Sequence, residues 1–168
     1  KIEYMKTIYI GADHRGFELK KTLIAWLKKK AYPVEDCGNT TYDPDDDYPD
    51  FVKNVVEKLF QQKTFLSEGH LTMHHSHEDK SGPSEYILQN SKHDVKIAQS
   101  IITKNSQNLG IVICGSGVGV SIAANRYKGI YCALGFDAGQ VKSAREHDHI
   151  NVLALGSDYV SNENAQKI

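Results

Sequence analysis

Short apolar segments alternate with longer amphipathic segments along most of the chain. Five segments are short, apolar and bounded by Gly, Pro or polar residues, which predicts strands: 6–11, 33–38, 110–115, 129–137 and 151–157. The stretches between them predict helices that begin near residues 17, 49, 118 and 138. In the first of these, Leu19, Leu23 and Leu27 recur every four residues and share one face.

This alternation of strands and helices predicts an α/β fold. Strands of nearly continuous apolar sequence are usually buried on both faces, so we expect a three-layer α/β/α, Rossmann-like fold with a five-stranded parallel sheet. A length of 168 residues suits one domain and is short for two, which predicts a single domain over residues 1–168. Ligands of such sheets bind outside the carboxyl ends of the strands.

Residues 61–91 depart from the alternation. They contain Ser, Gly, Pro, Asn and four histidines, with weak periodicity. A segment of about 30 polar residues cannot bury a core of its own, which favours an inserted, partly disordered surface loop within the domain. His70 and His74 have the spacing of a helical metal-binding pair, and His75 and His77 follow them. The Ser and Gly residues around them favour a solvated loop without metal.

The charge balance and the cysteine pattern narrow the classes of function. Lys and Arg number 20 and Asp and Glu 21, for a net charge of −1. This balance disfavours a nucleic-acid partner or an anionic membrane surface. No apolar stretch approaches the roughly 20 residues that cross a bilayer, and the first residues lack the features of a signal peptide, so we expect a cytoplasmic protein. Cys37, Cys114 and Cys132 are widely spaced, which favours reduced thiols.

The segment CGSGVG, from Cys114 to Gly119, stands where an apolar strand gives way to a helix. Its glycines allow close approach to the backbone, and successive N–H groups at a helix start form an anion-binding concavity. Cys114 lies beside these groups, where a thiolate would be stabilised. The segment lacks the Lys-Ser/Thr of a Walker loop, and it does not follow the first strand as a dinucleotide fingerprint does. Taken alone, it fits a tight turn after a buried cysteine equally well.

Three other groups of polar residues have both a functional and a structural interpretation. Asp13, His14 and Arg15 follow the first strand at the predicted functional edge, although Asp13 or Gly16 is also suited to cap the next helix. His147 stands near a helix end, where histidines commonly interact with the helix dipole. The acidic run at 43–47 is predicted to be a solvated turn before a helix, rather than a cation site.

Together these motifs resemble the ribose-5-phosphate isomerase B family, which also includes the galactose-6-phosphate isomerase subunits. The matching segments are IGADHRGFELK at 10–20, DYPDF at 47–51, ICGSGVGVSIAANRYKGIYCAL at 113–134 and REHDHINVLALG at 145–156. The resemblance implies a five-stranded parallel sheet between helices and an aldose–ketose isomerase that needs no metal or organic cofactor. It also implies a sugar-phosphate substrate and a homodimer or tetramer whose active sites are shared between subunits.

The resemblance also assigns roles by position. Cys114 matches the base that moves a proton between carbons 1 and 2 of the open-chain sugar. His147 matches a histidine that assists ring opening and comes from the opposite subunit. Asp13 and His14 match the pair that contacts the substrate hydroxyls and phosphate, and Tyr48 matches a tyrosine that lines the pocket. The residues that match the loop holding the enediolate oxygen are Gly115, Ser116, Gly117 and Gly119.

Three features depart from the family pattern. Asp148 stands where an asparagine that contacts substrate is common, and Asp158 stands where many members have a phosphate-binding arginine. The family's C-terminal arginines have no counterpart here, and Arg15 and Arg126 are the candidates to compensate for them. The sequence thus predicts interconversion of ribose 5-phosphate and ribulose 5-phosphate. It leaves open another substrate, galactose 6-phosphate or allose 6-phosphate, and a non-catalytic sugar-phosphate-binding subunit.

Overall fold

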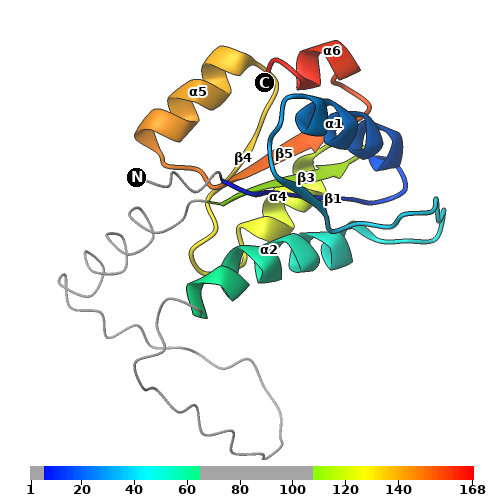
Figure 1. The fold of residues 1–168 in the computed structure, drawn as a ribbon, viewed down its shortest axis with the longest axis horizontal. Helices are drawn as coiled ribbons and strands as arrows, with labels where there is room; N and C mark the ends of the chain where they lie inside the picture. The colour runs from blue at the N-terminus through cyan, green and yellow to red at the C-terminus, as the bar shows by residue number, and fades with distance from the viewer. Residues whose placement is uncertain (1–5, 65–107) are drawn as a thin grey trace, which may run out of the picture.

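The computed structural model describes residues 6–64 and 108–168, and the side chains of 6–60 and 108–168. These residues form a parallel sheet with helices on both faces (Figure 1). The strands are β1 (Ile8–Ala12), β2 (Val34–Asp36), β3 (Leu109–Cys114), β4 (Cys132–Leu134) and β5 (Val152–Gly156). Their order across the sheet is β2-β1-β3-β5-β4, and every neighbouring pair is parallel. The predicted three-layer α/β/α, Rossmann-like fold is confirmed.

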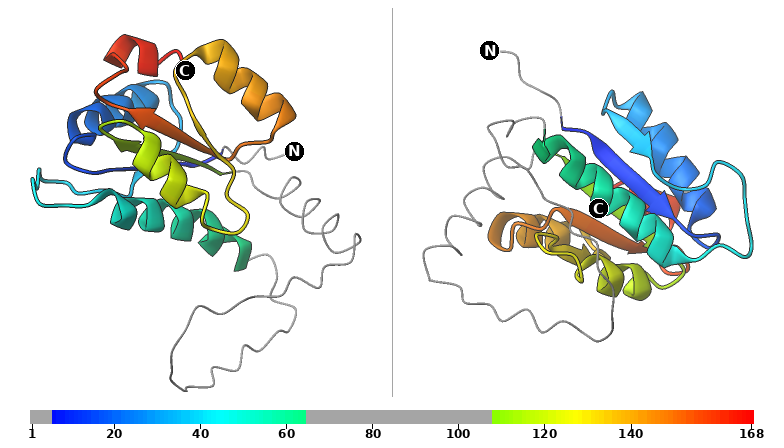
Figure 2. Two further views of the ribbon diagram at one scale, coloured as in Figure 1. Left: turned by 180° about the vertical axis from the view of Figure 1, so that it is seen from behind. Right: turned by 90° about the horizontal axis from the view of Figure 1, so that it is seen from below.

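The helices fall into two layers. They are α1 (Phe17–Lys29), α2 (Tyr48–Thr64), α4 (Val118–Ala124), α5 (Ala138–His147) and α6 (Asn162–Ala165). Helices α2 and α4 pack together on one side of the sheet, and α1, α5 and α6 lie on the other, as Figure 1 and the rear view in Figure 2 show. None of the helices in the described part of the chain is long and apolar enough to cross a membrane.

Helix α2 extends into the segment that the sequence predicts to be an inserted loop. It continues to Thr64, so residues 61–64, the start of the segment predicted to be an inserted loop, are helical. The rest of that segment lies outside the described residues, as do the four histidines at 70, 74, 75 and 77.

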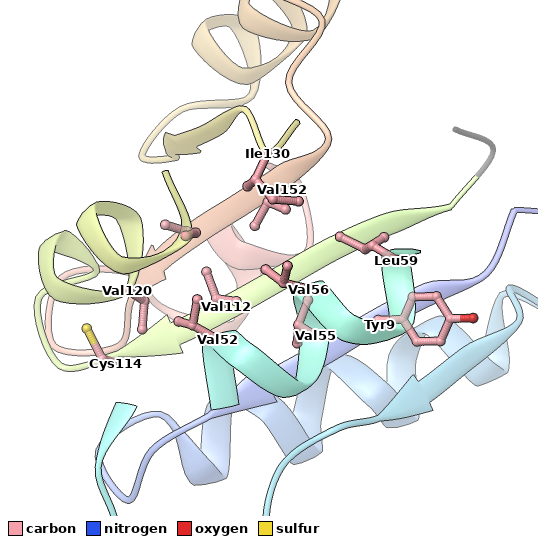
Figure 3. Close-up of a cluster of buried hydrophobic side chains, with 12 residues drawn as sticks. Tyr9, Val52, Val55, Val56, Leu59, Val112, Cys114, Val120, Ile130 and Val152 are labelled. Carbon is pink, nitrogen blue, oxygen red and sulfur yellow. The ribbon is translucent and has the colours of Figure 1, made fainter. Parts of the chain in front are cut away.

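The core divides between the two faces of the sheet. Side chains of successive strand residues point to opposite faces, so Tyr9 and Val112 pack under α2 while Ile10 and Ile113 pack under α1. The cluster beneath α2 and α4 is drawn in Figure 3, and Cys114 lies at one end of it. This burial on both faces is why the strands carry so few polar residues.

All the strands are parallel, but the order in which the chain adds them to the sheet reverses between β1 and β3. From β1 the chain runs outward to β2 through α1 on one face, and it returns to β3 after α2, which covers the other face. In open α/β sheets the crevice at the carboxyl ends of two such strands is the usual ligand site. Ala12 pairs with Ile113, so Asp13 and Cys114 follow at the same level of this edge.

Candidate active site

Cys114 ends β3 and is buried at the edge of the core (Figure 3). The chain turns after it through Gly117, whose φ of 75° lies in the left-handed region that glycine adopts without strain. The Gly117 N–H donates to the Cys114 Sγ at 3.2 Å, which favours negative charge on the sulfur. The exposed Ser116 hydroxyl accepts from the Val118 N–H at 3.2 Å and holds the turn closed.

Helix α4 begins immediately after this turn. The Ser121 N–H donates to the Gly117 carbonyl at 3.2 Å, and the N–H groups before Ser121 have no carbonyl partner within the helix. The Tyr48 ring, from the start of α2, packs directly on Gly119, because a Cβ on this glycine would lie 2.9 Å from the ring. The loop therefore leads into the first turn of α4, whose N–H groups are free of helical partners, and the Tyr48 ring covers one side of it.

Asp13 and His14 follow β1 beside this loop. The Asp13 N–H donates to the Ile113 carbonyl at 3.3 Å, which extends the pairing of β1 with β3. Its buried carboxylate accepts from the Gly16 N–H at 3.0 Å and closes the turn before α1. The N-cap of α1 is Gly16 and not Asp13, and no side chain among the described residues caps this helix. Burial raises the pKa of the Asp13 carboxyl.

His14 is held by Asp46, and this contact corrects an expectation. The Asp46 side chain is 7% exposed, so the prediction of a solvated turn at 43–47 is wrong for this residue. Its Oδ1 accepts from the His14 N–H at 2.6 Å and lies 3.1 Å from the imidazole Nδ1, while its Oδ2 accepts from the Asn39 amide at 3.0 Å. The hydrogen bond to Asp46 raises the pKa of His14. Four aspartates in one run gave no signal that singled out this one.

Arg15 forms an ion pair with Asp158 at the same edge. The sequence names Arg15 as a candidate to compensate for the missing arginines and Asp158 as a departure from the family pattern, without relating the two. The Asp158 N–H donates to the Gly115 carbonyl at 3.0 Å, and the Arg15 guanidinium lies so close to Gly115 that there is no room for a Cβ at this position. The Ser157 hydroxyl lies 2.9 Å from the Arg15 carbonyl and 3.2 Å from that of Cys114. The segment after β5 is thus tied to both the β1 and the β3 loops.

His147 and Asp148 lie at the opposite edge of the sheet. His147 is the last residue of α5 and Asp148 caps that helix, and both are exposed. The chain then enters β5 at Val152, whereas Cys114 is paired with Gly156 at the other end of the strand. The length of β5, roughly 13 Å at about 3.3 Å per residue, separates the two edges. The structure does not bring His147 and Asp148 to Cys114 within one chain.

The other two cysteines have different surroundings. Burial raises the pKa of the Cys37 thiol to about 11 and that of Cys132 to about 12, which disfavours a thiolate at either position. Arg126 is exposed in the turn that follows α4. In the ranges 6–64 and 108–168, no group of three or more His, Cys, Asp or Glu side chains is arranged to hold a metal ion.

These features define a class of protein. It is an α/β protein with a thiol beside a backbone N–H, a buried carboxylate and an imidazole bound by a carboxylate. These groups follow the carboxyl ends of the neighbouring strands β1 and β3. The chain belongs to the Ribose/Galactose Isomerase family, whose profile matches residues 8–67 and 62–168. The resemblance drawn from the sequence motifs is confirmed.

Individual relatives support the same assignment. The chain is 34% identical over 162 residues to a probable ribose-5-phosphate isomerase B of Mycoplasma genitalium, covering 96% of this chain and 78% of that protein. It is similar in structure to ribose 5-phosphate isomerase B from Anaplasma phagocytophilum, with a TM-score of 0.67, 30% identity and coverage of 96% and 81% of the two chains. The Mycoplasma genitalium enzyme with bound ribulose-5-phosphate matches with a TM-score of 0.64, 32% identity and coverage of 98% and 81%.

Proposed function

We propose that this chain is an aldose–ketose isomerase that interconverts ribose 5-phosphate and ribulose 5-phosphate through an enediolate, and that it acts in the cytoplasm. Family membership and the names of its relatives give the reaction class. The observation that carries the proposal is the Cys114 sulfur, which receives the Gly117 N–H at a helix start in the crevice between β1 and β3. Asp13 and His14 border the same crevice.

Cys114, as the thiolate, acts as the base. It takes the proton from carbon 2 of the open-chain aldose, and the electron pair of that bond forms a double bond between carbons 1 and 2. The electrons of the carbonyl move to its oxygen, which becomes the enediolate oxygen. The proton of the carbon 2 hydroxyl then moves to the carbon 1 oxygen, and Cys114 returns its proton to carbon 1, which leaves the carbonyl on carbon 2 and gives the ketose. No metal or organic cofactor takes part in these steps.

The loop after Cys114 stabilises the charge that forms. Backbone N–H groups held in a fixed turn lose little free energy on reorganisation, so they suit an oxygen that becomes negative only during the reaction. The residues proposed to surround this oxygen are Gly115, Ser116, Gly117 and Gly119. Tyr48 closes the side of the pocket through its contact with Gly119.

The residues after β1 bind the substrate. Asp13 contacts the sugar hydroxyls, from which its carboxylate can accept hydrogen bonds. The contact with Asp46 favours the charged imidazolium of His14, which suits a histidine that binds the substrate phosphate.

A second copy of the chain completes the site. His147, proposed to assist ring opening, and Asp148, proposed to contact substrate, lie at the wrong edge to reach Cys114 of their own chain. Val118 and Ile122, four residues apart on α4 beside the loop, are 47% and 54% exposed. An apolar helix face next to an incomplete site fits a homodimer or tetramer in which each copy supplies one edge to the other.

One observation favours a second candidate, a non-catalytic sugar-phosphate-binding subunit. The Asp158 carboxylate forms an ion pair with the Arg15 guanidinium, so Arg15 is not free to bind a phosphate. A larger sugar phosphate, such as galactose 6-phosphate or allose 6-phosphate, is the third candidate, because the family includes galactose isomerases.

An isomerase assay in deuterium oxide distinguishes these candidates. The purified chain is incubated with ribose 5-phosphate, galactose 6-phosphate and allose 6-phosphate, and both ketose formation and uptake of deuterium are followed. We expect ribose 5-phosphate to be converted with the highest kcat/KM. Conversion of a hexose phosphate alone would change the substrate, and binding without conversion of any sugar would support the non-catalytic subunit.

A further inference from the structure

Lys20, on α1, is fully buried at 0% exposure, although it carries a charge. Its ammonium donates to both Asp36 carboxylate oxygens, at 2.6 and 2.7 Å, and to the Asn39 carbonyl at 2.6 Å. Gly38 packs against it, because a Cβ there would lie 2.9 Å from Nζ. Lys20 thus clamps the segment after β2 from inside the protein.

Lys20 is the buried member of this ion pair, because the Asp36 side chain is 30% exposed. Removing the lysine ammonium from water costs free energy that its attraction to a partly solvated carboxylate only partly returns. The buried lysine is therefore better explained by what it holds in place.

The segment that Lys20 holds leads directly to the candidate site. The Asn39 side-chain amide donates to Asp46 Oδ2 at 3.0 Å, and Asp46 Oδ1 receives the His14 backbone N–H. The same Oδ1 lies 3.1 Å from His14 Nδ1. Each of these distances is within the range of a hydrogen bond, so the contacts lead from the Lys20 ammonium through Asn39 and Asp46 to the imidazole.

The last link determines the form of the imidazole. His14 Nδ1 faces two groups that only accept hydrogen bonds, the Asp46 carboxylate at 3.1 Å and the Asp46 backbone carbonyl at 3.3 Å, so the proton of neutral His14 is held on Nδ1. Nε2 then accepts a hydrogen bond when the ring is neutral and donates one when the ring is charged. Asp46 and Asp13 are the charged groups that act on this ring.

We propose that Lys20 is a positioning residue for His14: through Asp36, Asn39 and Asp46 it fixes the imidazole's orientation and its Nδ1–H tautomer. The role rests on the proposed function, in which His14 contacts the sugar phosphate. Lys20 touches no substrate.

The test compares Lys20→Met with Lys21→Met, a matched control because Lys21 is the next residue on α1 and is exposed in a pair with Glu18. Long-range proton–nitrogen spectra of the imidazoles, recorded at a pH high enough for His14 to be neutral and with its signals assigned through His14→Gln, report the tautomer directly. We expect Lys21→Met to retain the Nδ1–H form and Lys20→Met to show a mixture of both tautomers. An unchanged tautomer in folded Lys20→Met would overturn the proposal.

Asn39→Ala is the second variant, and it decides the question if Lys20→Met does not fold. It removes the amide to Asp46 but keeps the backbone carbonyl that binds Lys20. We expect the same mixed tautomer, and retention of the Nδ1–H form would contradict the proposal.

Kinetics separate this role from the proposed function. In both variants KM for ribose 5-phosphate should rise about tenfold, as for loss of one charge-assisted contact, while kcat changes by less than about threefold. A KM equal to that of Lys21→Met would contradict the positioning role. If the wild-type chain isomerises no sugar phosphate, the proposed function fails, and the spectra still show whether Lys20 sets the tautomer of His14.

Discussion

The two edges of the sheet differ in how completely they are built. At the carboxyl edge Asp13, His14 and Cys114 are each fixed by hydrogen bonds to backbone or carboxylate groups. At the amino edge His147 and Asp148 stand exposed at the end of α5. The difference is that hydrogen bonds hold the residues at the carboxyl edge, while the two at the amino edge are exposed, as expected if a second copy uses them.

The topology explains this division. Parallel strands require each helix to run back across the sheet, so α5 starts with its Asp137 cap after β4 and ends at the start of β5. A residue at the end of such a helix cannot reach the carboxyl edge of its own sheet. Sharing the site between copies is the arrangement that removes this constraint.

The largest expected effect comes from Cys114→Ala at the carboxyl edge. Loss of the proposed base should reduce isomerisation and deuterium uptake at carbon 2 by about 1,000-fold or more, with the fold retained. Cys132→Ala is the matched control, because this cysteine is also packed against the core cluster but has no place in the loop. Turnover of Cys114→Ala within a few-fold of wild type would remove Cys114 from the role of base.

A smaller effect is expected from Asp158→Ala. Removing the carboxylate frees the Arg15 guanidinium at the edge of the loop, so KM for the sugar phosphate should fall about threefold. Because the pair is largely exposed, the free energy of unfolding should change by less than about 1 kcal/mol. Glu146→Ala, which removes the exposed pair with Lys142, is the control. A rise in KM would mean that the ion pair itself organises the site.

The smallest effect concerns pH. Asp46 raises the pKa of His14 above its ordinary value of 6.5, so the charged form is favoured in the folded protein. The stabilisation is therefore full below pH 6.5 and is lost as the pH rises through the raised pKa.

Thermal unfolding of wild type and His14→Gln measures this contribution. The wild type should have the higher Tm at low pH, and the difference should shrink as the pH rises. Asp46→Asn should remove the same pH dependence, while Asp45→Asn, at an exposed position in the same turn, should retain it. A difference in Tm that grows with pH would contradict the assignment of Asp46 as the partner of His14.

The sequence was sufficient for the layers of the fold and for the segments that carry chemistry. Strands buried on both faces have a continuous apolar sequence, and the glycine-rich segment after Cys114 predicts a turn into a helix. The order of the strands could not be predicted, because the hydrophobic periodicity of a strand does not indicate which strands are its neighbours. That β1 and β3 are neighbours, with the chain running outward from each to opposite sides of the sheet, therefore became visible only in the structure.

The residues missed by the sequence are those whose roles depend on distant partners. Asp46 lies among other aspartates, and only the fold places it against His14, 32 residues earlier. Arg15 and Asp158 are 143 residues apart, so the ion pair has no local signature. Lys20 occupies a helical position where a lysine is ordinarily exposed, and its burial follows from the packing of the segment after β2.

Mixing two inactive variants tests the shared site most directly. Cys114→Ala and His147→Ala are each purified, combined in equal amounts and allowed to exchange subunits, and exchange is verified by mass spectrometry of differently labelled chains. Random exchange makes half of the dimers mixed, each with one intact site of two, so activity should recover to about a quarter of wild type. Addition of the double variant Cys114→Ala/His147→Ala to either single variant should restore nothing. Failure to recover activity after verified exchange, or full activity of a strictly monomeric wild type, would contradict the shared site.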